Sequence, residues 1–420
     1  MMRSLFSAIS GLRNHQTFMD VVGNNISNVN TTAFKASRVT FQDIMSQTLS
    51  GASAPTETRG GTNPVQVGLG STLASIDTIH TQGSLQSTGR LTDLAIQGDG
   101  YFVLSNGLGG QVYTRDGSFS IAVDGSLVNA NGLRVLGWMA DPTTGAIDTT
   151  QPLQPIVLPR DGDLIGMAST TSTFYGNLDQ RLDATDPNPA NKSVTTSITV
   201  YDSLGQSHQI TVTFTKTDNA TNQWSWTAST SEPGVTVTGN GTLQFDSTTG
   251  LYNDANGAAA DGTIQVTLTN GAANLNLDVH FSSLTQLASS SDVQARTDGA
   301  GPGSLSTVSI GVDGQITGIY TSGARRVLGQ IATATFANPA GLVKIGNNLY
   351  EVSPNAGDPD IGAPTTGSRG EVRSGFLEMS NVDLAQEFTN MILAERGFQA
   401  NSRIITATDE MLQDLVNIRR

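Results

Sequence analysis

The sequence predicts a multidomain, mainly β protein with α-helical termini. Both ends carry apolar residues at helical spacing, and the stretch from Asn381 to Arg420 contains no proline and one glycine, Gly397. The middle is rich in Gly, Ser, Thr, Asn and Asp, which suits short strands joined by tight turns. A chain of 420 residues also exceeds the size of one ordinary hydrophobic core. We therefore expect a pair of terminal helices and two nested, discontinuous β domains.

The C-terminal segment has an apolar residue at every seventh position. The companion register is mixed, because Phe388 and Val416 share it with Glu395, Ser402 and Asp409. This pattern is typical of a coiled coil whose seam is only partly apolar. The residues that define the main stripe are Leu384, Met391, Phe398, Ile405 and Leu412.

A second helix is predicted over residues 4–28, with Ser4 as its N-cap. Its apolar residues follow a similar spacing, and no segment adjacent to either helix can cover them. We therefore expect the helices to pair as one coiled-coil-like domain, formed by residues 1–30 and 371–420. The residues expected to pack with the C-terminal stripe are Leu5, Ile9, Leu12, Met19 and Ile26.

Residues 31–70 form an extended connector arm. The first part alternates weakly, and the second part is rich in Gly, Pro and Thr. Two interpretations remain open, a flexible linker or an ordered arm that packs against something else.

The inner β domain is predicted from two separate segments, residues 71–162 and 297–370. Asn-Gly and Asp-Gly dipeptides recur at hairpin-like intervals in the first segment. Residues 120–125 resemble residues 309–314, and Arg-Val-Leu-Gly follows in both copies. One β domain made from two chain segments explains this repeat better than chance similarity.

Residues 163–296 are predicted to be an insertion that forms an independent outer β domain. The insertion has alternating segments of its own, such as residues 197–214 and 222–230. It also lies in the acidic part of the chain, because residues 71–370 hold twelve basic and twenty-five acidic side chains. That balance argues against nucleic acid as a partner.

The sequence offers no catalytic constellation, and we predict no catalytic, cofactor-binding or metal-binding residues. There is no cysteine, which excludes disulfides and thiolate chemistry. The four histidines, His15, His80, His208 and His280, lie in different segments and in no metal-binding motif. No apolar run is long enough to span a membrane, and no cleavable signal peptide is recognisable.

Several stretches resemble the flagellar axial proteins, the rod, hook and hook-associated family. SLFSAISGL (4–12) and MDVVGNNISNVNTTAFK (19–35) are similar to the N-terminal signature of that family, and residues 377–412 to its C-terminal signature. TGRLTDLAIQGDGYFVL (88–104) is similar to the start of its inner β domain, and VYDSLGQSH (200–208) to a segment of hook outer domains. Together these stretches cover both ends and much of the inner domain.

The resemblance implies a structural protein that polymerises with itself into a curved tube outside the cell. Length and a single β insertion favour the hook, which transmits motor torque to the filament as a universal joint. The implied partners are the distal rod protein, the hook cap, the hook-associated junction protein and the flagellar type III export apparatus, without a cleaved signal peptide. The alternatives are a distal rod or hook-associated subunit, or a secreted β-rich adhesin with oligomerising tails.

Overall fold

The computed structural model describes residues 2–55, 59–107, 109–142, 144–159, 164–253 and 262–417. The chain divides into two compact units, and each is described by itself. The first unit comprises Met1–Leu158, Ser309–Ile316 and Val327–Arg420, and the second comprises Pro159–Val308 and Thr317–Arg326. Strands dominate both units, and helices occupy the two ends of the chain, which confirms the predicted fold class.

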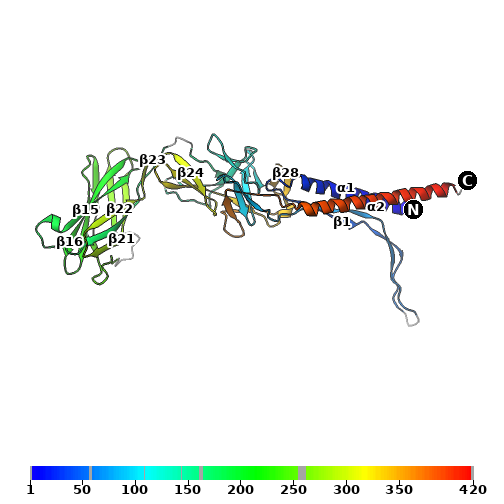
Figure 1. Cartoon of the computed structure of the whole chain (residues 1–420), viewed down its shortest axis with the longest axis horizontal. Helices are drawn as coiled ribbons and strands as arrows, with labels where there is room; N and C mark the ends of the chain where they lie inside the picture. The colour runs from blue at the N-terminus through cyan, green and yellow to red at the C-terminus, as the bar shows by residue number, and fades with distance from the viewer. Residues whose placement is uncertain are drawn as a thin grey trace. The chain divides into compact units, whose positions relative to one another are not determined.

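The terminal helices α1 (Met2–Ser27) and α2 (Leu384–Asn417) lie side by side in the first unit (Figure 1). Their direction is antiparallel, because Gly11 lies beside Asn401 while Asn25 donates a hydrogen bond to Glu387 at 3.3 Å. Asp383 caps the N-terminus of α2 by accepting hydrogen bonds from the backbone N–H groups of the first turn. The predicted pairing of the two ends is therefore confirmed.

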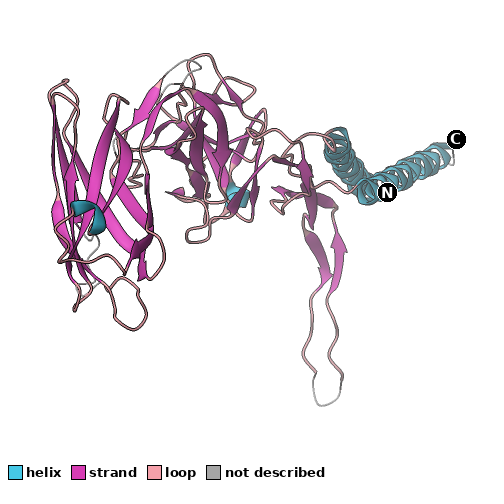
Figure 2. Ribbon diagram, turned by 60° about the vertical axis from the view of Figure 1, so that its left-hand side comes forward, coloured by secondary structure: helices cyan, strands magenta, loops and turns pink. Residues whose placement is uncertain are grey.

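Residues 37–55 and 59–78 form the two sides of a long β hairpin (Figure 2). The strands β1 (Ser37–Asp43) and β4 (Ser71–Thr78) pair at its base, and β2 (Ser46–Ser50) and β3 (Val65–Gly68) pair further out. The ordered arm is thus the interpretation that the structure supports. The hairpin also extends past residue 70, because β4 pairs with β1 along its whole length.

An antiparallel sheet forms the core of the first unit, and its central path runs β26-β11-β7-β8-β29-β28. The two repeated Arg-Val-Leu-Gly segments meet here, because Trp138 of β11 pairs with Gln330 of β26. Aromatic side chains including Tyr101, Tyr113 and Phe336 fill one face. The strands are β7 (Tyr101–Ser105), β8 (Gln111–Thr114), β11 (Arg134–Met139), β26 (Arg325–Ile331), β28 (Val343–Gly346) and β29 (Leu349–Glu351).

Short strands return the chain to α2. β31 (Glu371–Ser374) pairs with β6 (Leu94–Gln97), and β32 (Phe376–Glu378) pairs with β5 (Leu85–Ser87). Segments nearly 300 residues apart in the sequence thus lie together beside the helix pair. The remaining strands along this part of the chain are β9 (Ser120–Ile121), β10 (Leu127–Val128), β12 (Gln154–Pro155), β25 (Gln315–Tyr320), β27 (Thr333–Thr335) and β30 (Asp360–Gly362).

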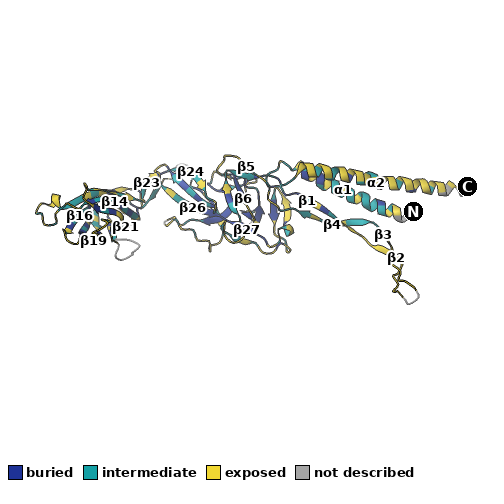
Figure 3. Ribbon diagram, turned by 60° about the horizontal axis from the view of Figure 1, so that its bottom comes forward, coloured by how far each residue is buried: buried dark blue, intermediate teal, exposed yellow. Residues whose placement is uncertain are grey.

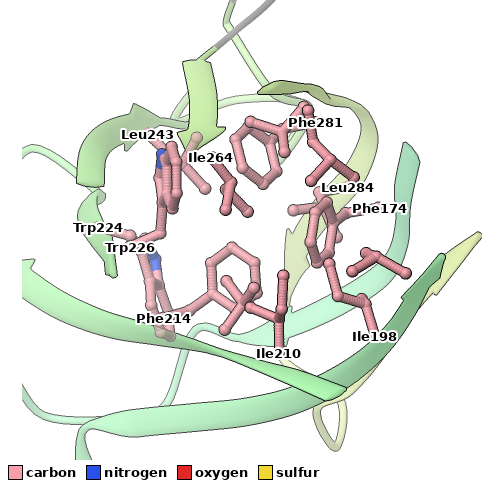
Figure 4. Close-up of a cluster of buried hydrophobic side chains, with 14 of the residues drawn as sticks. Phe174, Ile198, Ile210, Phe214, Trp224, Trp226, Leu243, Ile264, Phe281 and Leu284 are labelled. Atoms are coloured by element: carbon pink, nitrogen blue, oxygen red, sulfur yellow. The ribbon is translucent and has the colours of Figure 1, made fainter. Parts of the chain in front are cut away.

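The second unit packs two sheets around one apolar core (Figure 4). Their strand orders are β18-β20-β21-β14-β22 and β15-β16-β17-β19. β16 alternates between buried and more exposed residues, as a strand with one face on the core requires. The strands are β14 (Thr171–Asp179), β15 (Ser193–Tyr201), β16 (Ser207–Asp218), β17 (Gln223–Ser229), β18 (Val235–Thr238), β19 (Asn240–Gln244), β20 (Gly262–Leu268), β21 (Leu275–Leu287) and β22 (Asp292–Thr297).

The chain enters and leaves the second unit through adjacent strands. β13 (Ile165–Met167) pairs antiparallel with β23 (Ala300–Gly303), and β24 (Leu305–Ile310) follows. This pairing lets residues 159–308 form a compact unit inside a longer chain. The predicted insertion, residues 163–296, is slightly shorter than that unit because β23 and β24 continue beyond its predicted end.

Candidate assembly surface

Small and polar residues make the contact between α1 and α2. Among the α2 side chains that the structure describes, Ala394 and Thr408 are buried, and Ala8, Val22 and Asn25 are buried on α1. A Cβ atom added to Gly11 would lie 2.6 Å from the side-chain nitrogen of Asn401. The helices therefore approach closely along this seam, which leaves little room for large side chains.

The apolar stripe predicted for α2 lies at the edge of this seam. Met391, Ile405 and Leu412 are half-buried, whereas Leu384, Phe388 and Phe398 are exposed. The side chain of Val416 lies outside the described residues. On α1, every residue of the predicted stripe is half-buried: Leu5, Ile9, Leu12, Met19 and Ile26.

The predicted companion register differs from the structure. Glu395, Ser402 and Asp409 are exposed, and the buried register lies one residue earlier, at Ala394 and Thr408. The expectation that the polar positions lie in the seam is therefore wrong. The physical reason is that regularly spaced large apolar residues mark any helix face that becomes buried, whether within the chain or against a neighbour. A close contact between two helices instead requires small residues.

Exposed apolar residues flank the seam on both sides of α2. At 100° per residue, Phe388 and Ile392 fall on one flank, and Leu393, Ile404 and Met411 fall on the other. Phe388 is 50% exposed and Leu393 is 60% exposed. Figure 3 shows that α2 is largely exposed while α1 is mostly of intermediate burial. One partner helix thus leaves two apolar flanks of α2 in solvent.

The hairpin arm carries a second group of exposed apolar side chains. Its base is fixed to α1, because Phe18 and Phe41 pack edge to face at 6.1 Å and Asn14 donates a hydrogen bond to Ser71 at 2.8 Å. The outer part has no comparable cover, and an isolated two-stranded hairpin is marginally stable in water. Its exposed apolar residues are Ile44, Met45, Leu49, Val65 and Val67.

The histidines occupy four unrelated environments. His15 lies in the helix seam against Gly397, and His80 lies beside Tyr101, where burial and nearby cations lower its pKa to about 4. His280 lies on β21 of the second unit. Within the described ranges, no group of three or more His, Asp or Glu side chains is arranged to hold a metal ion.

The VYDSLGQSH stretch (200–208) has a structural role, because its Asp202 and His208 hold neighbouring groups through hydrogen bonds. Asp202 is fully buried and accepts hydrogen bonds from the backbone N–H groups of Leu204 and Gln206, which closes the turn before β16. His208 contacts Asp202 at 3.3 Å and Glu232 at 2.9 Å through its two ring nitrogens. The residues of this stretch thus hold a turn and an edge of the second unit together.

Among the described residues, no helix has both the length and the apolar character needed to cross a membrane. The exposed apolar residues of α2 are interrupted by charged positions such as Glu395 and Arg396. The apolar surface is therefore divided into patches, which suits contact with protein surfaces of mixed character.

Family comparisons match most of the chain. The Flagella basal body rod protein family matches residues 5–35, and the Flagellar hook protein FlgE/F/G D1 domain matches residues 95–170. The Flagellar basal body protein FlaE D2 domain matches residues 169–300. The Flagellar basal body rod FlgEFG protein C-terminal family matches residues 373–418.

Similar proteins extend over the whole chain. The flagellar hook protein FlgE of Borreliella burgdorferi is 43% identical, with 100% of each chain covered. The flagellar basal-body rod protein FlgG of Bacillus subtilis is 34% identical, again with 100% of each chain covered. The crystal structure of the Helicobacter pylori flagellar hook protein FlgE2 has a similar fold, with a TM-score of 0.50 at 16% identity over 70% of this chain and 100% of that one.

These matches include both terminal helices, the sheet of the first unit and the second unit. On this evidence, the chain belongs to the flagellar hook and basal-body rod family of structural proteins.

Proposed function

We propose that this chain is the structural subunit of a bacterial flagellar hook, which polymerises with itself into a curved helical tube. The observation that carries the proposal is the apolar surface left exposed on both flanks of α2. A subunit with two such flanks can contact neighbours on two sides, and head-to-tail contacts that do not close generate a helical filament. Burial of these residues between subunits would supply the main driving force for polymerisation.

The assembly surface comprises the predicted residues of both helices together with the hairpin arm. Phe388 and Phe398 would bury large aromatic surfaces against neighbouring copies. The arm would bury Leu49 and Val67, which have no cover in a single chain. Leu5, Ile9, Leu12, Met19 and Ile26, already half-buried, would lose their remaining exposure in the polymer.

In this role the chain would lie outside the cell, between the distal rod protein and the hook-associated junction protein. The hook cap and the flagellar type III export apparatus would be its partners during assembly. The polymer would then transmit motor torque to the filament as a universal joint. The family membership of the chain supports these assignments.

Polymerisation by purified protein tests the proposal. Phe388→Ser combined with Ile392→Ser removes apolar surface from one flank of α2 without touching the seam. We expect the variant to remain folded by circular dichroism and to lose tubes by electron microscopy. Val123→Ser is the matched control, because Val123 is also exposed but lies in a turn far along the chain from the helices. Tubes of normal abundance in the double variant would refute the proposed role of this flank.

A distal rod subunit is the second candidate function. The full-length similarity to the Bacillus subtilis protein named basal-body rod protein FlgG favours it. Gold labelling of the chain on isolated hook–basal bodies separates the two functions. Label along the curved segment outside the cell supports the hook, whereas label confined to the straight rod supports the alternative.

A further inference from the structure

A cavity of about 330 Å³ lies in the first unit beside β7 and the loop after β27. The residues that line it belong neither to α2 nor to the outer part of the arm. Its lining combines polar and charged side chains with two aromatic rings. The residues that define it here are His80, Asp99, Tyr101, Arg115, Thr335 and Ser368.

Arg115 is the most unusual residue of this lining. It is only 3% exposed, and one of its terminal nitrogens, Nη2, donates to the backbone carbonyl of Gly98 at 2.8 Å. Its Nε lies 3.5 Å from a carboxylate oxygen of Glu378. The other terminal nitrogen, Nη1, is buried and has no hydrogen-bond partner in the described part of the chain. A buried guanidinium N–H without an acceptor is costly, and it indicates that an acceptor belongs in the cavity.

His80 supplies a second buried nitrogen without a partner. Its Nδ1 lies 2.7 Å from the hydroxyl of Tyr101, and its Nε2 is buried without a partner among the described residues. Burial raises the pKa of Tyr101 to about 12, so the phenol stays protonated and can donate a hydrogen bond to Nδ1. In that tautomer Nε2 carries the hydrogen, so two residues of the lining each have a buried donor without an acceptor among the described residues.

The surroundings of the cavity carry an excess of positive charge. Lys35 and Arg115 both face Glu378, and Lys35 contacts it at 2.6 Å with both side chains fully buried. Lys344 adds a third cation, which donates to the carbonyl of Lys35 at 2.9 Å. Against these stand Glu378 and Asp99, and Asp99 is exposed at the rim. In the lining itself Arg115 and Asp99 balance, and the excess comes from Lys35 and Lys344 outside it. Two donors in these surroundings favour an anion that accepts hydrogen bonds.

We propose that this cavity is a binding site for a small oxyanion, held by Arg115 Nη1 and His80 Nε2, with the hydroxyls of Thr335 and Ser368 beside it. A phosphate ion and the carboxylate of an acidic side chain share the chemistry that this site would recognise. The first would come from solution, and the second from a neighbouring copy of the chain. The site sits next to the buried Lys35–Glu378 pair, so an occupant would also stabilise the junction between the chain ends and the sheet.

Calorimetric titration of the full-length monomer with inorganic phosphate tests the site. The titration is run at neutral pH in a buffer without other oxyanions. We expect saturable binding to a single site. Ser368→Asp places a fixed carboxylate at the cavity and should weaken phosphate binding by at least about tenfold, because the two anions compete and repel. Val123→Asp is the matched control, because it adds the same charge at an exposed position outside the lining, and it should change binding by less than about twofold.

Ser368 and Val123 are both exposed, so neither change buries a charge in the folded chain. Absence of saturable binding, or equal binding by Ser368→Asp and Val123→Asp, would overturn the proposal. Asp99→Asn tests whether the rim carboxylate is itself the acceptor for Arg115. Binding that occurs only in Asp99→Asn would overturn the proposal, because the site would then be occupied internally.

The assembled polymer distinguishes the two sources of the oxyanion. Phosphate retained after assembly and washing identifies a free ion as the occupant. Phosphate released in proportion to assembly identifies a carboxylate of a second copy, which takes its place. Either result supports an oxyanion site, and the monomer titration decides whether the site exists.

Discussion

The imidazole ring of His15 on α1 lies directly against Gly397 on α2. A Cβ atom added to Gly397 would meet three atoms of that ring at less than van der Waals distance. Gly397 is the single glycine of α2, in the interior of a helix where glycine is otherwise unfavourable by about 1 kcal/mol relative to alanine. Glycine at position 397 therefore leaves the space that lets the helix carrying His15 approach α2.

Gly397→Ala should destabilise the helix pair even though alanine favours helix formation. The methyl group displaces His15, and overpacking of this kind costs about 1–3 kcal/mol. The measurement is the loss of helical circular dichroism with temperature. Combining Gly397→Ala with His15→Ala should recover the loss, because the second change removes the ring that collides. Gly23→Ala is the matched control, because a Cβ there meets nothing within 4 Å. A melting temperature raised by both glycine substitutions would contradict this account.

The pairing of the two helices was predictable from sequence, but the face they share was not. Phe398 of the main stripe and Phe388 of the companion register both follow the seven-residue spacing of a coiled coil, yet both residues are exposed. The seam instead uses Ala394 and Gly397, whose small size produces no apolar signal. When several faces of a helix become buried, its sequence carries regularly spaced apolar residues on each of them. The sequence alone therefore does not identify the face that packs against the other helix of the same chain.

The arm shows a second limit of prediction. Its strand character was visible only weakly, and the pairing of β1 with β4 joins residues that are distant in sequence, from Asp43 with Ser71 to Ser37 with Thr78. Strand pairing depends on such non-local contacts, which composition does not specify. The repeated Arg-Val-Leu-Gly segments were different, because their similarity predicted one β domain made from two chain segments, and β11 and β26, which carry them, pair in one sheet. Arg115 and the buried Nε2 of His80 gave no sequence signal, because their proposed role depends on the cavity around them.

Glu378→Gln should strongly destabilise the first unit. Glu378 is fully buried, pairs with Lys35 at 2.6 Å and accepts the backbone N–H of Gly83 at 2.9 Å. Burial lowers the pKa of Lys35, and the charge of Glu378 opposes that shift. Removing the carboxylate leaves a buried cation without its partner, which costs about 3–5 kcal/mol. Urea unfolding with hydrogen exchange of the segments around both residues measures the loss.

Asp77→Asn provides the control for this pair. Asp77 and Arg38 also form an ion pair, at 3.6 Å, but both side chains are largely exposed. Exposed pairs contribute about 0–1 kcal/mol, so this variant should unfold almost as the parent chain does. Equal losses in the two variants would show that burial of the Lys35–Glu378 pair does not matter.

The second unit should lose stability in acid through Asp202. Burial alone would raise the pKa of this carboxyl, but hydrogen bonds from Asn270, Gln206, His208 and Leu204 outweigh burial and lower it. A carboxyl whose pKa is lower in the folded state than in the unfolded state stabilises the fold. This stabilisation is fully present at pH values above the unfolded pKa of about 4. That contribution disappears as the pH falls through the lower, folded pKa.

Asp202→Asn should therefore reduce the stability of the second unit at pH 7 and flatten its decline in acid. Asparagine keeps an oxygen acceptor for the turn but has no charge to lose. The urea midpoint, followed by the fluorescence of Trp224 and Trp226, is compared between neutral and acidic pH in both proteins. Parallel declines in the parent and the variant would rule out Asp202 as the source. Glu232, whose pKa is lowered first by its hydrogen bond with His208, adds a contribution of the same sign.

Phe281→Ala should unfold the second unit more readily than any surface change on the same sheet. The ring of Phe281 lies 5.1 Å from that of Phe174 and 5.4 Å from that of Trp226 (Figure 4), so its removal leaves a cavity between the two sheets. Phenylalanine-to-alanine changes in such cores cost about 3–5 kcal/mol. Tyr175→Ala is the control, because Tyr175 neighbours Phe174 on β14 but is 42% exposed. It should cost less than about 1 kcal/mol, measured by the same fluorescence. Similar losses in both variants would mean that the two sheets do not depend on this aromatic cluster, and that the second unit is held chiefly by its strand pairing.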